Sequence, residues 1–294
     1  ALHGYHDVHL CFPKGSSITG QAVSLQFNQS PTNAVNWKVP ILPFLEQSAF
    51  YDNIDFTRTL LATSMSSGST SKNETALKNV IVPAYDCPSD SVEQFATRTN
   101  CHNENCRTQT SCYVGISGAV PDPAGRTDVY ILPSSGYMAN SGMLCLNQWK
   151  NISDDLDGTS NSLMVGEQSG LIGKETPAFC RSNYAGHWAG VWTRLTDTDS
   201  GNYYNVQHLI GMGYTSGKGN IYATGITTVY YMINYQTRSS YTYDTYHSCT
   251  VLNSFHKGGV NGLIADGAVR FFPDTISMDL LRRWASANDG LSVE

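Results

Sequence analysis

The chain has 294 residues, a net charge of −6 and charged side chains at only 14% of its positions. Soluble domains usually carry about 25% charged residues, and the low charge with abundant small polar residues and tyrosine indicates an extracellular, β-rich protein. The acidic balance excludes nucleic-acid binding, because no basic surface is available to neutralise phosphates. No stretch reaches the roughly 18 apolar residues of a membrane-spanning helix.

The first fifteen residues, "ALHGYHDVHLCFPKG", predict the last turns of a helix. Leu2, Tyr5 and Val8 follow one another at helical spacing, and Pro13 and Gly15 end the pattern. Because the chain begins with alanine, we expect the natural precursor to extend upstream, with a leading segment removed or left out.

Three further segments follow before residue 91. Residues 36–55 predict a short helix that starts at Pro40 or Pro43. Its expected apolar face contains Leu42, Leu45, Ala49 and Phe50. Residues 63–75 are small and polar and predict an exposed loop. The stretch "NVIVPAYDCPSD" predicts a short buried strand or an extended segment that a Pro-Ser-Asp turn closes.

From residue 113 onward the sequence predicts strands and turns. The candidate strands are rich in β-branched and aromatic residues or bounded by turn residues: "MLCLNQW", "SNSLMVGEQSG", "TTVYYMINYQ" and "SYTYDTYHSCTVL". We expect a single domain over residues 1–294, with a loop-rich insertion at roughly 168–250.

A hairpin and a helix are expected at the C-terminus. The Asp266-Gly267 pair between two apolar runs predicts a two-residue type I′ turn. The resulting register pairs Ala265 with Ala268, Ile264 with Val269, Leu263 with Arg270 and Gly262 with Phe271, and it gives Val260, Ile264, Val269 and Phe271 a common core face. Ser277 caps the expected last helix, in which Leu280, Leu281 and Trp284 pack inward, ending at residues 288–290.

Eight cysteines predict disulfides, because an even number of thiols suits an oxidising compartment. They are Cys11, Cys87, Cys101, Cys106, Cys112, Cys145, Cys180 and Cys249, and spacing alone leaves their pairing open. A zinc knuckle at Cys101, Cys106 and Cys112 beside His102 is the weaker alternative, because a CxxC pair is lacking.

Nine residues separate His256 from the Asp266-Gly267 pair, which raises the question of a catalytic dyad. A strand rises about 3.3 Å per residue, so the two side chains are expected on the order of 20 Å apart, far beyond a hydrogen bond of about 3 Å. We therefore expect Asp266 and Gly267 to make a turn and His256 to anchor the entrance of the strand. No nucleophile, acid/base pair or complete metal-ligand set emerges, which predicts a protein that is not an enzyme.

Two binding sites are weighed against structural alternatives. Asp155, Asp157 and Asn161 supply oxygen ligands for calcium, with Glu167 nearby, although an Asx-type turn before a strand explains the same residues. The Tyr-rich stretch 229–246 would suit a carbohydrate-binding surface, although such residues are more often half-buried strand positions.

Six blocks, in this order, resemble a bacterial family of type IV pilin-like proteins with a prepilin-type cleavage and methylation segment and a C-terminal His-x9-Asp-Gly pattern. In this chain the pattern falls on His256, Asp266 and Gly267. The blocks span residue 1 to about 276 and are sparse between 168 and 250. They are "ALHGYHDVHLCFPKG", "WKVPILPFLEQSAFYD", "VPAYDCPSD", "YVGISG", "DGTSNSLMVGE" and "HKGGVNGLIADGAVRFFPDTI".

The resemblance implies an exported α+β protein whose globular head is an antiparallel sheet packed on a long N-terminal helix. Only the end of that helix is expected here, so membrane attachment would depend on a helical segment that this chain lacks. Pseudopilin-type heads often hold calcium, which strengthens the case for Asp155 and Asp157. The implied function is that of a structural subunit at the bacterial cell surface, in a type IV pilus-like filament or a type II secretion pseudopilus. Its partners would be further copies or other pilin-like subunits, and the alternative is a surface module that binds a glycan.

Overall fold

The computed structural model describes residues 1–17, 35–56, 72–91, 94–96, 108–132, 136–169, 171–173, 178–179, 188, 191–194, 220–237, 239, 242 and 249–293. Most of the predicted loop at 63–75 and most of the predicted strand at 240–252 lie outside these residues. The described part is α+β, as expected, with one central sheet and few helices.

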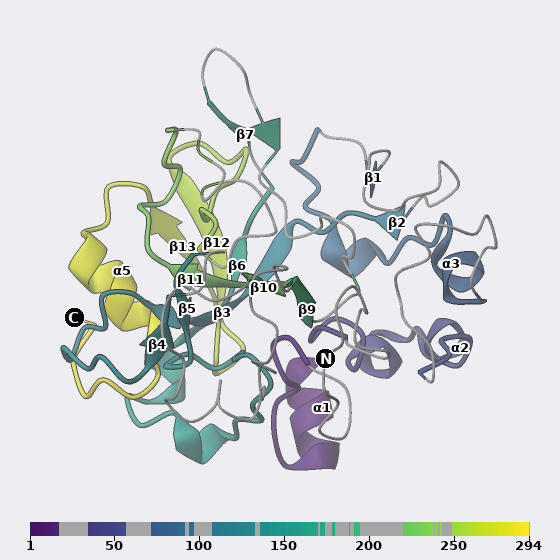
Figure 1. The fold of residues 1–294 in the computed structure, drawn as a ribbon, viewed down its shortest axis with the longest axis horizontal. Helices are drawn as coiled ribbons and strands as arrows, with labels where there is room; N and C mark the ends of the chain where they lie inside the picture. The colour runs from purple at the N-terminus through teal and green to yellow at the C-terminus, as the bar shows by residue number, and fades with distance from the viewer. Residues whose placement is uncertain are drawn as a thin grey trace, which may run out of the picture.

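The central sheet has five strands in the order β11-β3-β6-β12-β13 (Figure 1). Their bounds are β3 Tyr113–Ala119, β6 Leu163–Glu167, β11 Ile226–Val229, β12 Gly259–Ile264 and β13 Val269–Pro273. Strands β3, β6, β12 and β13 pair antiparallel, but β11 runs parallel to β3. The sheet is therefore mixed, and the expectation of a purely antiparallel sheet is wrong at this edge.

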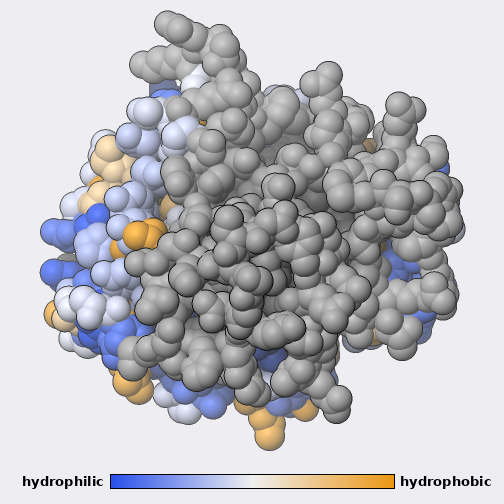
Figure 2. All heavy atoms as spheres, in the orientation of Figure 1, coloured by the Kyte–Doolittle hydropathy of each residue, from blue (hydrophilic) through white to orange (hydrophobic). Residues whose placement is uncertain are grey.

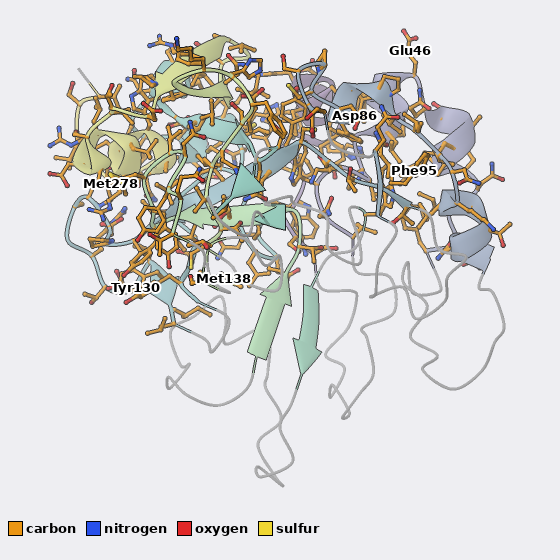
Figure 3. All side chains as sticks on the ribbon, turned by 90° about the horizontal axis from the view of Figure 1, so that it is seen from above. Glu46, Asp86, Phe95, Tyr130, Met138 and Met278 are labelled. Carbon is orange, nitrogen blue, oxygen red and sulfur yellow. The ribbon has the colours of Figure 1, made fainter. Side chains whose placement is uncertain are left out.

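Both faces of this sheet are covered. Helix α5 (Met278–Ala285) packs on one face, where Leu281 and Trp284 meet Val260, Ile264 and Phe272. The opposite face packs on residues from the first half of the chain, among them Trp37, Leu42 and Leu144. In Figure 1, α5 lies at one end of the sheet and the short helices α2 (Ser48–Tyr51) and α3 (Lys72–Leu77) lie at the other end of the molecule. The labelled side chains of Figure 3 show the same separation, with Met278 at one end and Glu46, Asp86 and Phe95 at the other.

The C-terminal helix matches its prediction closely. Ser277 Oγ accepts a hydrogen bond from Leu280 N at 3.2 Å, which caps the helix as expected. Leu281 is fully buried and Trp284 is 6% exposed. The helix ends at Ala285, before the predicted stop at residues 288–290.

The hairpin before it forms, but with a register one residue away from the prediction. Leu263 pairs with Val269, Gly262 with Arg270 and Val260 with Phe272. Shifting a strand by one residue exchanges its two faces. Phe272 is therefore in the core, whereas Val269 and Phe271, which we expected there, are 68% and 50% exposed.

The remaining elements are short. Four two-stranded ribbons are formed by β1 Phe95–Ala96 with β2 Thr108–Gln109, β4 Tyr130–Ile131 with β5 Met138–Ala139, β7 Leu171–Ile172 with β8 Ala178–Phe179, and β9 Val191–Arg194 with β10 Asn220–Ala223. Single turns of 3-10 helix are η1 Leu42–Leu45, η2 Pro83–Tyr85, η3 Ile152–Asp154 and η4 Thr159–Asn161. The last described strand of the insertion, β11, belongs to the central sheet.

The N-terminal residues form helix α1, Leu2–His9, as predicted. The helix ends where Leu10 adopts a left-handed conformation with φ of 59°. Leu2 joins the core, and His3 Nε2 lies 2.9 Å from the carbonyl oxygen of Ala265 at the tip of the β12–β13 hairpin. The helix end is thereby docked on the part of the sheet that the C-terminal hairpin builds.

Three predicted elements differ from the structure. Residues 36–55 form two short helical turns instead of one helix, because Glu46 takes a left-handed φ of 61° between η1 and α2. The segment 79–90 has an extended residue, Val82, followed by the 3-10 turn η2 that Pro83 starts, so the strand form of its prediction is not present. Residues 143–149 form no strand: Leu146 makes an isolated bridge to Ser16, and single backbone hydrogen bonds join Leu144 to Ile116 and Cys145 to Gly15.

The five cysteines within the described ranges are not joined to one another by disulfides. Cys87, Cys112, Cys145 and Cys249 are buried, and burial raises the pKa of the Cys145 and Cys249 thiols to about 11. The disulfide prediction is therefore wrong for pairs among these five. Cys101, Cys106 and Cys180, with His102 of the knuckle alternative, lie outside the described residues.

Lys38 is an unusual member of the core. Its side chain is fully buried, with Nζ 5.0 Å from the ring centre of Trp37, and its carbonyl oxygen accepts a hydrogen bond from the Tyr85 hydroxyl at 2.6 Å. Burial disfavours the charged ammonium and lowers the pKa of Lys38 to about 7, against a smaller opposing effect of Cys112.

None of the helices in the described part of the chain has the length and apolar character needed to cross a lipid bilayer.

Candidate metal centre

Three side chains from distant segments meet beside the central sheet. Cys87 follows the turn η2, Glu167 is the last residue of β6, and His256 lies in the loop that leads into β12. His256 Nε2 is 3.2 Å from Glu167 Oε1 and 3.5 Å from Cys87 Sγ. All three ligand atoms lie within 4.8 Å of one another, and this is the only such group of His, Cys, Asp or Glu side chains among the described residues.

The sheet fixes Glu167. Tyr113 pairs with Glu167 across β3 and β6, so the carboxylate extends from the face that packs on the first half of the chain. Asn261 N donates to Glu167 Oε2 at 2.7 Å. One carboxylate oxygen is thus held by the β12 backbone, and the other faces His256.

Local hydrogen bonds position the other two side chains. Ser254 Oγ accepts from His256 N at 3.1 Å and donates to Gly259 O at 2.7 Å, which closes the loop around His256. Asp90 N donates to Cys87 O at 2.9 Å and makes the turn that the sequence "CPSD" predicts. Cys112 N donates to Tyr85 O at 2.9 Å and holds that turn against the start of β3.

The surroundings of the cluster are acidic. The pKa of the Cys87 thiol is raised by burial, by Glu167 and by Asp90, against the opposing effect of a hydrogen bond from the Ser89 backbone. Burial and the neighbouring Cys87 and Glu167 also raise the pKa of Tyr113 well above its ordinary value. Glu167 is 1% exposed and Cys87 is 6% exposed, whereas the His256 side chain is 30% exposed. Of these three side chains, only His256 has substantial contact with solvent.

Two chemical arrangements use Cys, His and a carboxylate. In a nucleophilic triad the imidazole bridges the other two groups, with one ring nitrogen toward the thiol and the other toward the carboxylate. Here the same nitrogen, Nε2, faces both groups. The three atoms converge on one point, as the ligands of a metal ion do.

His256 and Asp266 serve different purposes. Asp266 Oδ1 accepts from Ala268 N at 2.8 Å within its own turn, and this hydrogen bond lowers the pKa of the exposed carboxyl. His256 faces Glu167 and Cys87 instead. From the sequence, Cys87 was expected in a disulfide and Glu167 only beside the calcium loop. The available signal was that three of the six resembling blocks each contain one member of the cluster.

The residues of the predicted calcium loop have other partners. Both oxygens of Asp157 accept backbone N–H groups, from Asp289 at 2.8 Å and from Gly290 at 2.7 Å. Asn161 Nδ2 donates to Asp157 O, and Asp155 Oδ1 accepts from Ser162 Oγ. Asp155 Oδ2 is buried without a hydrogen-bond partner. The turn interpretation thus has contacts in its favour, and calcium stays a prediction.

The calcium prediction has a direct test. Because a ligand that binds only the folded state raises its melting temperature, millimolar Ca²⁺ added to metal-free protein is expected to raise the melting temperature of the wild type. The Asp155→Asn variant, measured in the same calorimetric scan, is expected to show a smaller rise. An equal rise in both proteins would place any bound calcium elsewhere.

The described tyrosines of the predicted glycan surface pack against other tyrosines, within the stretch and outside it. Tyr230 stacks on Tyr137 at 4.8 Å between ring centres, and Tyr231 stacks on Tyr235 at 5.1 Å. Tyr230 and Tyr231 meet edge to face at 4.9 Å. These contacts are typical of half-buried aromatic clusters, and glycan binding stays a prediction.

A comparison with protein families matches nearly the whole chain. The profile of a family described as "Protein of unknown function (DUF1559)" matches residues 1–279, and this family is associated with pilin-like, prepilin-type proteins. No curated protein and no solved structure matched the chain. Because the match covers nearly all of its length, the chain belongs to the DUF1559 family.

Proposed function

We propose that this protein is a non-enzymatic structural subunit: the extracellular head of a pilin-like protein that assembles into a surface filament or a secretion pseudopilus. Membership of a family associated with pilin-like proteins supports this role. The observation that carries the proposal is the docking of α1 on the C-terminal hairpin through His3 and Ala265. A helix that packs on the sheet of its own head is the arrangement on which pilin-like assembly depends.

The outer side of α1 offers apolar contacts for a neighbouring subunit. Val8 is 66% exposed and Leu10 is 76% exposed. An isolated antiparallel bridge joins Phe12 to Lys150, which brings the exposed Trp149 to the same region. Figure 2 shows hydrophobic residues among hydrophilic ones along the lower margin of the molecule, where α1 lies in Figure 1. Exposed apolar residues that gather in one place are typical of protein contact sites.

The change Val8→Asp is expected to reduce assembly. A carboxylate placed in an apolar contact loses its hydration without gaining a partner. We expect at least a tenfold smaller share of the protein in filaments sheared from the surface of the producing cells, measured by quantitative immunoblotting. The melting temperature of the purified chain should stay unchanged, because Val8 is exposed.

Val269→Asp is the matched control. Val269 is 68% exposed, close to the 66% of Val8, but it lies on β13. We expect this variant to assemble like the wild type. Equal assembly of the wild type and both variants would contradict a role of α1 in subunit packing, and so would equal losses in both variants.

A further inference from the structure

We infer that Cys87, Glu167 and His256 bind a Zn²⁺ ion that keeps one coordination position open toward solvent. This inference does not rest on the proposed assembly role, since it concerns a site beside the central sheet. It is carried by the spacing of the three ligand atoms, their burial, their supporting hydrogen bonds and the charge around them.

The spacing fits a tetrahedral zinc ion. Zinc lies about 2.3 Å from sulfur and about 2.0–2.2 Å from nitrogen and oxygen, so the ligand atoms of one tetrahedral ion stand roughly 3.3–3.6 Å apart. His256 Nε2 and Cys87 Sγ are 3.5 Å apart, and His256 Nε2 and Glu167 Oε1 are 3.2 Å apart. These two distances match the tetrahedral spacing, and the third pair, Cys87 Sγ and the Glu167 carboxylate, lies within 4.8 Å.

The types of ligand favour zinc over calcium and magnesium. Calcium and magnesium prefer a shell made of oxygen atoms, which Cys87 and His256 do not offer. A thiolate, an imidazole and a carboxylate are all ordinary zinc ligands, and thiolate favours the softer transition metals.

A bound cation would also balance a buried charge. Glu167 is 1% exposed, and among the described residues its only ion-pair partner is His256. A buried carboxylate is costly unless a positive charge compensates it. The acidic side chain of Asp90 lies close to Cys87 and adds to the negative potential.

Hydrogen bonds outside the ligand set orient two of the ligands. Glu167 Oε2 is held by Asn261 N, which leaves Oε1 directed at the cluster. Ser254 fixes the backbone of His256. Such supporting contacts commonly accompany metal ligands, and their loss weakens metal binding by about 10–100-fold.

The fourth position has no protein ligand in the described cluster. Cys112, just before β3, also lies against the turn that contains Cys87. Its Sγ donates to Asp90 Oδ2 at 3.0 Å, and it is not one of the three converging residues. The partial exposure of His256 gives the site a solvent side. Zinc with three protein ligands completes its shell with water.

The test is metal titration of the full chain after its metals have been removed under reducing conditions. In competition with a chromophoric chelator, we expect one zinc ion per chain at this site and at least tenfold weaker binding by His256→Gln and Glu167→Gln. Substitution by Co²⁺ should produce a thiolate-to-cobalt charge-transfer absorption. That absorption should disappear in Cys87→Ser and persist in Cys112→Ser.

Circular dichroism and melting temperatures of the metal-free proteins separate lost binding from lost folding. His256→Gln is the decisive variant, because its partly exposed side chain makes global unfolding the least expected outcome. Unchanged zinc affinity in His256→Gln would overturn the inference. So would a charge-transfer absorption that survives Cys87→Ser, since the metal would then be held by other thiols. Neither result would bear on filament assembly, which the Val8→Asp variant tests separately.

Discussion

Replacing Trp284 with alanine is expected to lower the free energy of unfolding by about 3–5 kcal/mol, the usual cost of removing a large buried aromatic side chain. Trp284 is 6% exposed and meets Phe272 edge to face at 5.3 Å between ring centres. The guanidinium carbon of Arg270 lies 5.0 Å from the same indole ring. The cavity would open between α5 and the β12–β13 hairpin, and urea unfolding followed by circular dichroism measures its cost.

Trp149→Ala removes the same atoms from a different environment. Trp149 is 61% exposed, and its main contact is the ammonium of Lys14, 3.8 Å from the ring centre. Losing an exposed cation–π contact costs about 0.5–1 kcal/mol. An equal decrease in the free energy of unfolding of the two variants would mean that α5 does not pack on the sheet in solution as it does in the structure.

The docking of α5 also shows what local sequence determines. The start of the helix is set by Ser277, because its side chain can cap the helix without any contact to distant residues. The burial of Leu281 and Trp284 follows from their spacing on one helix face. Both features depend on residues within one or two turns, so they were predictable.

The hairpin register depends on a finer distinction. A two-residue type I′ turn needs positive φ at both central residues, and a three-residue turn needs it only at the last one. Gly267 has a φ of 93°, whereas Asp266 is not among the residues with positive φ. Gly267 N bonds to Ile264 O, and Ile264 N bonds to Ala268 O. The sequence Asp-Gly is compatible with both turns. The structure has the three-residue turn, which places Phe272 on the core face and Val269 on the exposed face.

The cluster of Cys87, Glu167 and His256 could not be predicted from the sequence because its residues meet only through long-range packing. Cys87 and His256 are brought to Glu167 by a turn that binds β3 and by a loop that enters β12. The sequence contains no short metal-binding motif at any of the three positions. The parallel pairing of β11 with β3 was hidden for the same reason, since the insertion gives no sign of the strand it joins.

The number of cysteines led to a wrong prediction of disulfides among the five described ones. Eight cysteines in a low-charge chain predict disulfides, yet four of the five described thiols, Cys87, Cys112, Cys145 and Cys249, are buried without forming a disulfide with one another. Cys145 is fully buried, and its Sγ donates to Gly142 O at 3.0 Å. Cysteine is among the most frequently buried residues, so its number alone does not distinguish packing from cross-linking.

The change Lys38→Met is expected to stabilise the protein at pH 7 and to alter how its stability depends on pH. In the folded state the pKa of Lys38 falls from 10.5 to about 7 because the ammonium is buried. Between these values the unfolded chain holds a proton that the folded chain has released, so folding of the wild type becomes more favourable as pH rises. Below pH 7 Lys38 is protonated in both the folded and the unfolded chain, so the folded protein bears the full cost of burying its charge.

The free energy of unfolding of Lys38→Met should therefore exceed that of the wild type by less at pH 9 than at pH 7. We expect this difference to shrink by roughly 2 kcal/mol over that range, at up to about 1.4 kcal/mol per pH unit. Urea unfolding at a series of pH values measures this difference, and taking the difference cancels the titration of groups that do not interact with Lys38. Lys78→Met, which replaces an exposed lysine by the same residue, is the control for the substitution itself. A difference in free energy of unfolding that stays constant with pH for Lys38→Met would mean that Lys38 keeps its charge on folding, because only a released proton links its burial to pH.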